Sequence, residues 1–198
     1  ATGAAVYVTG DFAGTLALEG SGPFQGNVFT MVSSGRKDAF VVKLNGDAGS
    51  IMWTAKIGGP LDDVGRAIAV DATGDGLITG GFSNTTSFTH RAGGTFAGST
   101  LTVDSAGYDD AFIAKYDSAG QGQWAMRAGG GLSDGGSGVA VDAAGNVLVT
   151  GHFSGTANFE AWTLGDTPNF GGHTITAAGF RDVFVAKFKS TGILEWSL

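Results

Sequence analysis

The sequence predicts an all-β protein assembled from a repeated four-stranded unit, and three observations support this class. Of the 198 residues, 36 are glycine, only three are proline, and 42% are hydrophobic. Much glycine among Val, Ile, Phe and Thr indicates many short strands joined by tight turns. No apolar pattern at helical spacing is long enough for a helix. Finally, closely similar segments recur along the chain at a fixed interval, which is typical of repeat architectures.

The interval is set by several independent landmarks. An Asp that precedes an apolar residue and, in turn, a Phe recurs at steps of 72 residues, at Asp38, Asp110 and Asp182. A Trp follows each of them, at steps of 71 and 72 residues, at Trp53, Trp124 and Trp196. The segments "YVTGDF", "LITGGF" and "LVTGHF" repeat at steps of 70 and 71 residues. Chance does not explain landmarks that keep one period.

Each repeat contains two hairpins. "RAIAV" (66–70) and "GLITGGF" (76–82) flank the turn "DATGD", while "DAFIAKYD" (110–117) and "GQWAMRA" (122–128) flank the turn "SAGQ". Asp and Gly are typical of such turns. We name the four strands of a repeat a, b, c and d. Four antiparallel strands per repeat predict a β-propeller blade, and each blade buries its apolar faces against its neighbours.

The chain is expected to be a single partial propeller over residues 1–198, with blades at about 1–57, 58–128 and 129–198. Its first segment, "ATGAAVYVTG", matches "ATGDGLITG" in the a–b hairpin of the second repeat, so the first blade is predicted to lack strand a. Known propellers have at least four blades. We therefore expect other copies of the chain, or the rest of a larger propeller, to complete the structure.

The repeat also has a family resemblance. "GSGVAVDAAGNVLVTGHFSGTANF", followed by "FGGHTITAAGFRDVFVAKFKSTGILEW", resembles the SBBP-type β-propeller repeat of bacterial extracellular proteins, and the likeness covers almost the whole chain. The resemblance implies the fold and a secreted or cell-surface location, which the low content of charged residues also favours. It implies no activity, because propellers carry many unrelated functions.

Long excursions separate strands b and c in every repeat. They contain "FQGNVFT", "FAGSTLT" and "FGGHTIT", in which apolar residues alternate with Thr and Gly. This alternation predicts an extra short strand or hairpin in each blade. Since b–c and d–a connections share one face of a propeller, we expect the excursions to crowd this face, here called the top face.

Charge and composition exclude several classes of partner. The net charge of −7 argues against a nucleic-acid surface and against docking on anionic lipid. No apolar run approaches the ~20 residues of a membrane helix. The chain has no cysteine, so neither a disulfide framework nor a thiolate nucleophile is available.

Repeated carboxylates have two interpretations. Asp38, Asp110 and Asp182 either bind cations or sugar hydroxyls as a ring, or accept backbone N–H groups where strand c begins, and we favour the structural role. Asp62, Asp63 and Asp134 lie on glycine-rich d–a loops, where clustered oxygens suit calcium. No EF-hand or RTX spacing is present, so turn capping is preferred and no cofactor is expected, with calcium as the alternative.

Aromatic residues divide in the same way. The repeated Trp53, Trp124 and Trp196 are expected to pack between blades. Trp162 has no counterpart in the other repeats and lies in the longest excursion, near Glu160 and Asp166. These three residues and His90 are candidate contacts for a sugar or a partner, although burial of Trp162 beneath its own loop is the favoured alternative.

The sequence therefore predicts a non-catalytic repeat protein that acts in assembly or interaction and completes a ring or filament with other chains. The alternative is an extracellular module that binds carbohydrate or calcium on the top face. The histidines lack metal-ligand spacing, and no nucleophile elbow is present.

Overall fold

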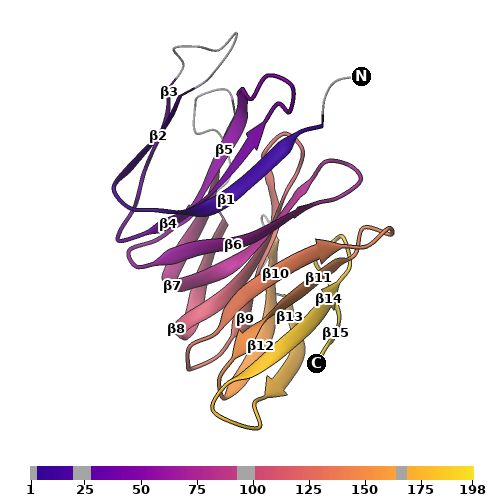
Figure 1. Cartoon of the computed structure of the whole chain (residues 1–198). Helices are drawn as coiled ribbons and strands as arrows, with labels where there is room; N and C mark the ends of the chain where they lie inside the picture. Colours follow the sequence, from indigo (N-terminus) through magenta and orange to yellow (C-terminus); the bar gives the residue numbers. More distant parts are fainter. Residues whose placement is uncertain (1–3, 20–27, 93–100, 164–168) are drawn as a thin grey trace.

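The computed structural model describes residues 4–19, 28–92, 101–163 and 169–198 (Figure 1). All regular structure in these ranges is β, as expected. The strands are β1 (Val6–Phe12), β2 (Thr15–Glu19), β3 (Val28–Val32), β4 (Asp38–Leu44), β5 (Ile51–Gly58), β6 (Asp63–Val70), β7 (Gly76–Ala92), β8 (Leu101–Tyr116), β9 (Gly122–Gly129), β10 (Gly135–Val141), β11 (Val147–Phe153), β12 (Thr156–Thr163), β13 (Asn169–Thr176), β14 (Asp182–Phe188) and β15 (Leu194–Ser197). No helix in the described ranges is long and apolar enough to span a membrane.

The strands form three antiparallel blades that follow one another in chain order (Figure 1). The first blade is β1-β4-β5, and β1 pairs only with β4 among the described strands. The second is β6, the first half of β7, the second half of β8, and β9. The third is β10-β11-β14-β15. This arrangement confirms the prediction of an all-β fold made of propeller blades with an incomplete first blade.

The b–c excursions do form hairpins, but the expectation that they crowd the top face is wrong. The second half of β7 pairs with β5 of the preceding blade, with Phe88 opposite Ile57. In the same way β12 pairs with β9, with Phe159 opposite Ala128. The hairpins of the second and third blades therefore extend the outer edge of the preceding blade's sheet, because the backbone groups of strand d are available there.

A residue with positive φ marks the start of every hairpin. Gly14, Asn84 and Gly155 have φ values of 70°, 63° and 66° and lie at equivalent positions, two residues after the Phe that ends the TG-x-F segment. In β7 the pairing register shifts between Ser83 and Thr85, around this residue. The left-handed conformation thus redirects the chain from its own blade to the preceding one.

The core lies between blades. One buried cluster fills the first junction and includes Trp53, Ile57 and Phe112. The other fills the second junction and includes Trp124 and Phe184. In the second and third blades the hairpin contributes a Phe that packs edge-on against strand c of its own blade, with ring centroids 5.6 Å apart in both the Phe88–Phe112 and Phe159–Phe184 pairs. These hairpins therefore form backbone hydrogen bonds with the preceding blade and pack their Phe side chains on their own blade.

The repeated tryptophans lie under the c–d turn of the following blade. The indole N–H of Trp53 donates to the Ser118 carbonyl over 3.1 Å, and that of Trp124 donates to the Ser190 carbonyl over 3.0 Å. Both side chains are buried, whereas Trp196 in the last blade is 38% exposed. The degree of burial follows from whether a next blade is present to cover the ring.

Candidate functional site at the blade junctions

Two fully buried carboxylates lie side by side at the first junction. Asp38 accepts the backbone N–H of Ser34 over 2.8 Å and forms an ion pair with Lys56 at 3.1 Å. Asp63 accepts the N–H of Gly59 over 2.8 Å, and its own N–H donates to the carbonyl of Lys37 over 2.8 Å. These bonds tie the entry of strand c in one blade to the entry of strand a in the next.

The second junction repeats the arrangement. Asp110 accepts the N–H of Ala106 over 2.6 Å and forms an ion pair with Arg127 at 3.6 Å. Asp134 accepts the N–H groups of Gly130 and Ser154 over 2.7 and 2.8 Å. In the last blade the equivalent Asp182 accepts the Ala178 N–H over 2.6 Å but is not buried. Where a next blade follows, these carboxylates are internal parts of the junction.

Burial raises the pKa of both Asp63 and Asp110 to about 7, against the smaller opposing effect of their hydrogen bonds. The pKa of Asp134 is raised for the same reason. One oxygen of Asp63 is buried and has no hydrogen-bond partner among the described residues. These groups respond to pH. Asp63 and Asp110 are fully buried and lie too deep to bind a ligand from solvent, whereas Asp134 lines the smaller of the two pockets described below.

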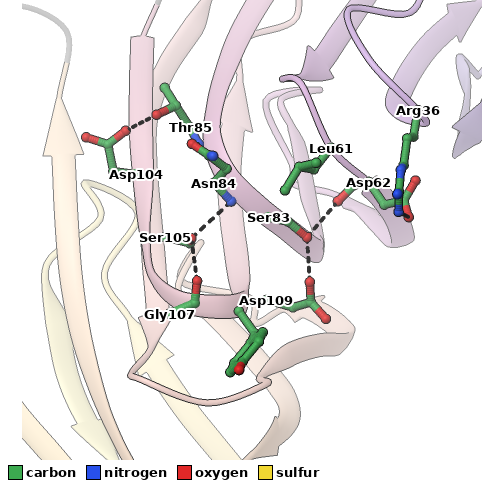
Figure 2. A pocket seen from close by; sticks show the side chains of 11 residues that line it. Arg36, Leu61, Asp62, Ser83, Asn84, Thr85, Asp104, Ser105, Gly107 and Asp109 are labelled. Carbon is green, nitrogen blue, oxygen red and sulfur yellow. Dashed lines mark hydrogen bonds and ion pairs between the residues drawn. The ribbon is translucent and has the colours of Figure 1, made fainter.

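An open pocket of about 690 Å³ lies between the first two blades (Figure 2). The first blade and the loop after it supply Arg36, Leu61 and Asp62, and the remaining lining belongs to the second blade. That part consists of Ser83, Asn84, Thr85, Asp104, Ser105, Gly107, Tyr108 and Asp109. The pocket therefore exists only because two blades meet.

Hydrogen bonds preorganise the pocket wall. The Ser83 hydroxyl donates to Asp109 and contacts the Asp62 carbonyl at 3.3 Å, while the Ser105 hydroxyl accepts the Asn84 N–H over 3.0 Å. Arg36 approaches Asp62 at 3.9 Å, with both side chains exposed. Such a lining of carboxylates, hydroxyls and one guanidinium can bind a polar, hydroxylated ligand.

A smaller pocket of about 320 Å³ lies next to it, near the inner strands. Basic side chains from successive blades, Arg66, His152 and Arg181, line it together with Asp109 and Asp134. Burial lowers the pKa of His152, and the two nearby arginines lower it further. The histidine is therefore a neutral hydrogen-bonding group at neutral pH.

The calcium candidates have different placements. Asp63 and Asp134 belong to different junctions and accept backbone N–H groups, whereas Asp62 lines both pockets and shares the smaller one with Asp134. Across the described ranges, no group of three or more His, Cys, Asp or Glu side chains is placed to hold a metal ion.

The candidate contacts in the excursions have different placements. Glu160 forms an ion pair with Arg127 of the preceding blade. The backbone of Trp162 pairs with Ala125, and that of His90 with Ala55. The side chains of Trp162 and His90 lie outside the described part of the structure, as does Asp166.

Sequence reasoning missed Arg36 and Tyr108 in the pocket. They share one repeat position with Phe180, directly after a repeated glycine and two residues before the repeated Asp. Tyr108 is 73% exposed and Phe180 is 93% exposed. A position that varies inside an otherwise regular repeat was the available signal for a surface role.

No protein-family model matches the chain, so the resemblance to SBBP repeats stays a prediction. Over 128 residues, or 65% of the chain, the sequence is 27% identical to an uncharacterized WD repeat-containing protein of Acanthamoeba polyphaga mimivirus. The chain spans 9% of that protein's length. Together with the three blades, this similarity points to a propeller-type repeat protein.

Proposed function

We propose that this chain is a non-catalytic propeller segment whose role is interaction, and that its two end faces bind further blades to complete a ring or a filament. The main observation concerns the face of the first blade that points away from the second blade, here called the front face. Val8 is 39% exposed, whereas the equivalent Ile78 and Val149, each covered by a preceding blade, are fully buried. The first blade thus presents an apolar surface of the kind that every internal junction covers.

The face of the last blade that points away from the second blade, here called the back face, also exposes apolar side chains. Val183 is 78% exposed, while the equivalent Ala39 and Ala111 are fully buried by a following blade. The front and back faces therefore belong to the two types of surface that the internal junctions join. A head-to-tail contact that closes gives a ring, and one that does not close gives a filament.

The relation to a WD repeat-containing protein supports an interaction role, since repeat proteins of stacked blades present extended surfaces to partners. The partners we propose are other copies of the chain or blades of a larger propeller.

Sedimentation velocity over a dilution series tests the proposal. We expect species heavier than the 19.9 kDa chain at high concentration, dissociating on dilution. A folded monomer at every concentration, also after addition of other blades of this repeat type, would overturn it.

A second candidate function is binding of a carbohydrate in the larger pocket. The observation that favours it is an exposed aromatic ring, Tyr108, beside the carboxylates of Asp62, Asp104 and Asp109. Sugars combine apolar ring faces with hydroxyls that such groups bind. A glycan array with and without calcium, repeated with Tyr108→Ala, tests it; binding that survives the substitution unchanged would exclude this pocket.

A further inference from the structure

Among the strands that the structure describes, none pairs with the outer edge of the β2–β3 hairpin of the first blade. In the two later blades the first strand of the equivalent hairpin pairs with strand d of the preceding blade. Among the described strands, β2 pairs only with β3. The edge of β2 consequently presents unpaired N–H and C=O groups, which form a template for another strand.

The β2–β3 hairpin shares its side-chain arrangement with the hairpins that do pair with a preceding blade. Met31 is buried, like the equivalent Val103 in the second blade. Leu18 occupies the position of Phe88 and Phe159, because each of the three lies six residues after the Phe that ends its own TG-x-F segment. The burial of β2 alternates along the strand, with Leu16 and Leu18 turned inward. An ordered edge costs less conformational entropy on binding than an unfolded one.

Charge identifies the partner. Glu19 lies at the position of Glu160, because each follows its positive-φ glycine, Gly14 or Gly155, by five residues. Glu160 lies opposite Arg127 of β9 and forms an ion pair with it, and both side chains are largely buried there, 14% and 11% exposed. Glu19, by contrast, is exposed.

At both internal junctions strand d carries a basic residue three positions after its tryptophan, Lys56 in β5 and Arg127 in β9. We propose that the β2 edge is a binding site for an outer strand with the pattern Trp-x-x-basic-x-Gly. The strand pairs antiparallel with Ala17–Glu19, its Gly lies opposite Ala17, and its basic side chain forms an ion pair with Glu19. The register is that of β12 on β9.

This inference rests on the proposed assembly role and specifies one contact of it. The c–d turn of the first blade differs from the others, since it is closed by the bond from the Asn45 N–H to the Ser50 carbonyl and is one residue longer than Asp117–Gln121. The c–d turn of the first blade therefore does not repeat the geometry that accepts a tryptophan N–H from a preceding blade. The hairpin is the part of the junction that the first blade shares with the other two.

A charge-swap experiment with the full chain tests the site. The probes are two fluorescein-labelled peptides with the sequence of residues 122–134, one native and one carrying Arg127→Glu. Fluorescence anisotropy measures their binding to the wild-type chain and to Glu19→Lys. Because the substituted side chain is exposed, circular dichroism should be unchanged.

We expect the wild-type chain to bind the native peptide at least about tenfold more tightly than the swapped peptide, and Glu19→Lys to reverse the preference. Glu195→Lys is the matched control: it changes the net charge equally but lies in the last blade, and should leave the preference of the wild type intact. A preference that follows net charge in both variants would overturn the proposal, as would the absence of saturable binding up to about 1 mM.

The two proposals fail separately. If the chain self-associates in the dilution series but does not distinguish the native peptide from the swapped peptide, the assembly role stands and this contact is excluded. Peptide binding that obeys the charge swap in a chain that stays monomeric would establish the strand site and count against head-to-tail assembly of identical copies.

Discussion

Gly14, Asn84 and Gly155 show how single residues control the path of the chain. Each adopts a positive φ at the point where strand b leaves its blade. Glycine reaches this region freely, Asn tolerates it, and other residues pay for the clash between Cβ and the backbone. The three residues therefore determine whether the excursion turns back onto the preceding blade.

Gly14 offers a clean test, because a Cβ added there would meet no atom within 4 Å. Gly14→Ala should lower the free energy of unfolding by about 1 kcal/mol through backbone conformation alone. Gly14→Asn, which copies Asn84, should cost less. Chemical denaturation of both variants measures the difference, and equal losses would indicate a steric cause instead.

Asp63 should make stability depend on pH. Burial raises its folded pKa to about 7, above the ordinary value of 3.8, so the folded state binds the proton more tightly than the unfolded state. Stability is then greatest below about pH 4 with respect to this group and falls as the pH rises to about 7, by on the order of 2–4 kcal/mol.

Asp63→Asn should remove this contribution, since the amide oxygen can still accept the Gly59 N–H and carries no charge. We expect the variant to be more stable than the wild type at pH 8 and close to it at pH 4. Denaturant titrations at the two pH values decide the matter; an identical pH slope in both proteins would show that Asp63 is not the group responsible.

At the scale of elements, the exchanged hairpins couple neighbouring blades. The hairpins of the second and third blades each make backbone hydrogen bonds to the preceding blade and place a Phe on strand c of their own blade. Disrupting one junction therefore removes both ladder pairing and apolar packing. This explains why the core lies between the blades instead of within any one of them.

The tryptophans allow the value of a junction to be measured. Trp124→Ala should cost about 3–5 kcal/mol, because it empties a buried site and removes the bond to Ser190. Trp196→Ala removes the same side chain where no blade covers it, and should cost about 1–2 kcal/mol. Thermal and denaturant unfolding compare them. Equal losses would mean that the following blade does not stabilise Trp124.

For the whole molecule, the end faces decide the state of association. Val8→Lys places a charge on the front face, at a position that is buried in both later blades. It should weaken head-to-tail association about tenfold or more without lowering the stability of the single chain, since Val8 is exposed there.

Met52→Lys is the matched control, because Met52 is also an exposed apolar residue but its equivalents are Gln123 and Glu195. Sedimentation equilibrium of both variants gives the association constants. If the two substitutions weaken association to the same degree, net charge and not the front face is responsible.

The sequence by itself determined the all-β class, the repeat, and the four strands of each blade, because these depend on local alternation, turn residues and a period that can be read along the chain. It also indicated a hairpin in each excursion. The role of Asp38 and Asp110 as acceptors of backbone N–H groups could be proposed from their repetition alone.

Only the tertiary structure decided where the hairpins go and which residues share a pocket. The pairing of β12 with β9 joins residues of different repeats, and nothing local distinguishes that edge from the top face. The larger pocket likewise brings Arg36 and Asp62 next to Asp104 and Tyr108 across a junction. A sequence pattern reports the faces of each strand, but which outer edge a neighbouring blade leaves open for pairing is a property of the packed arrangement.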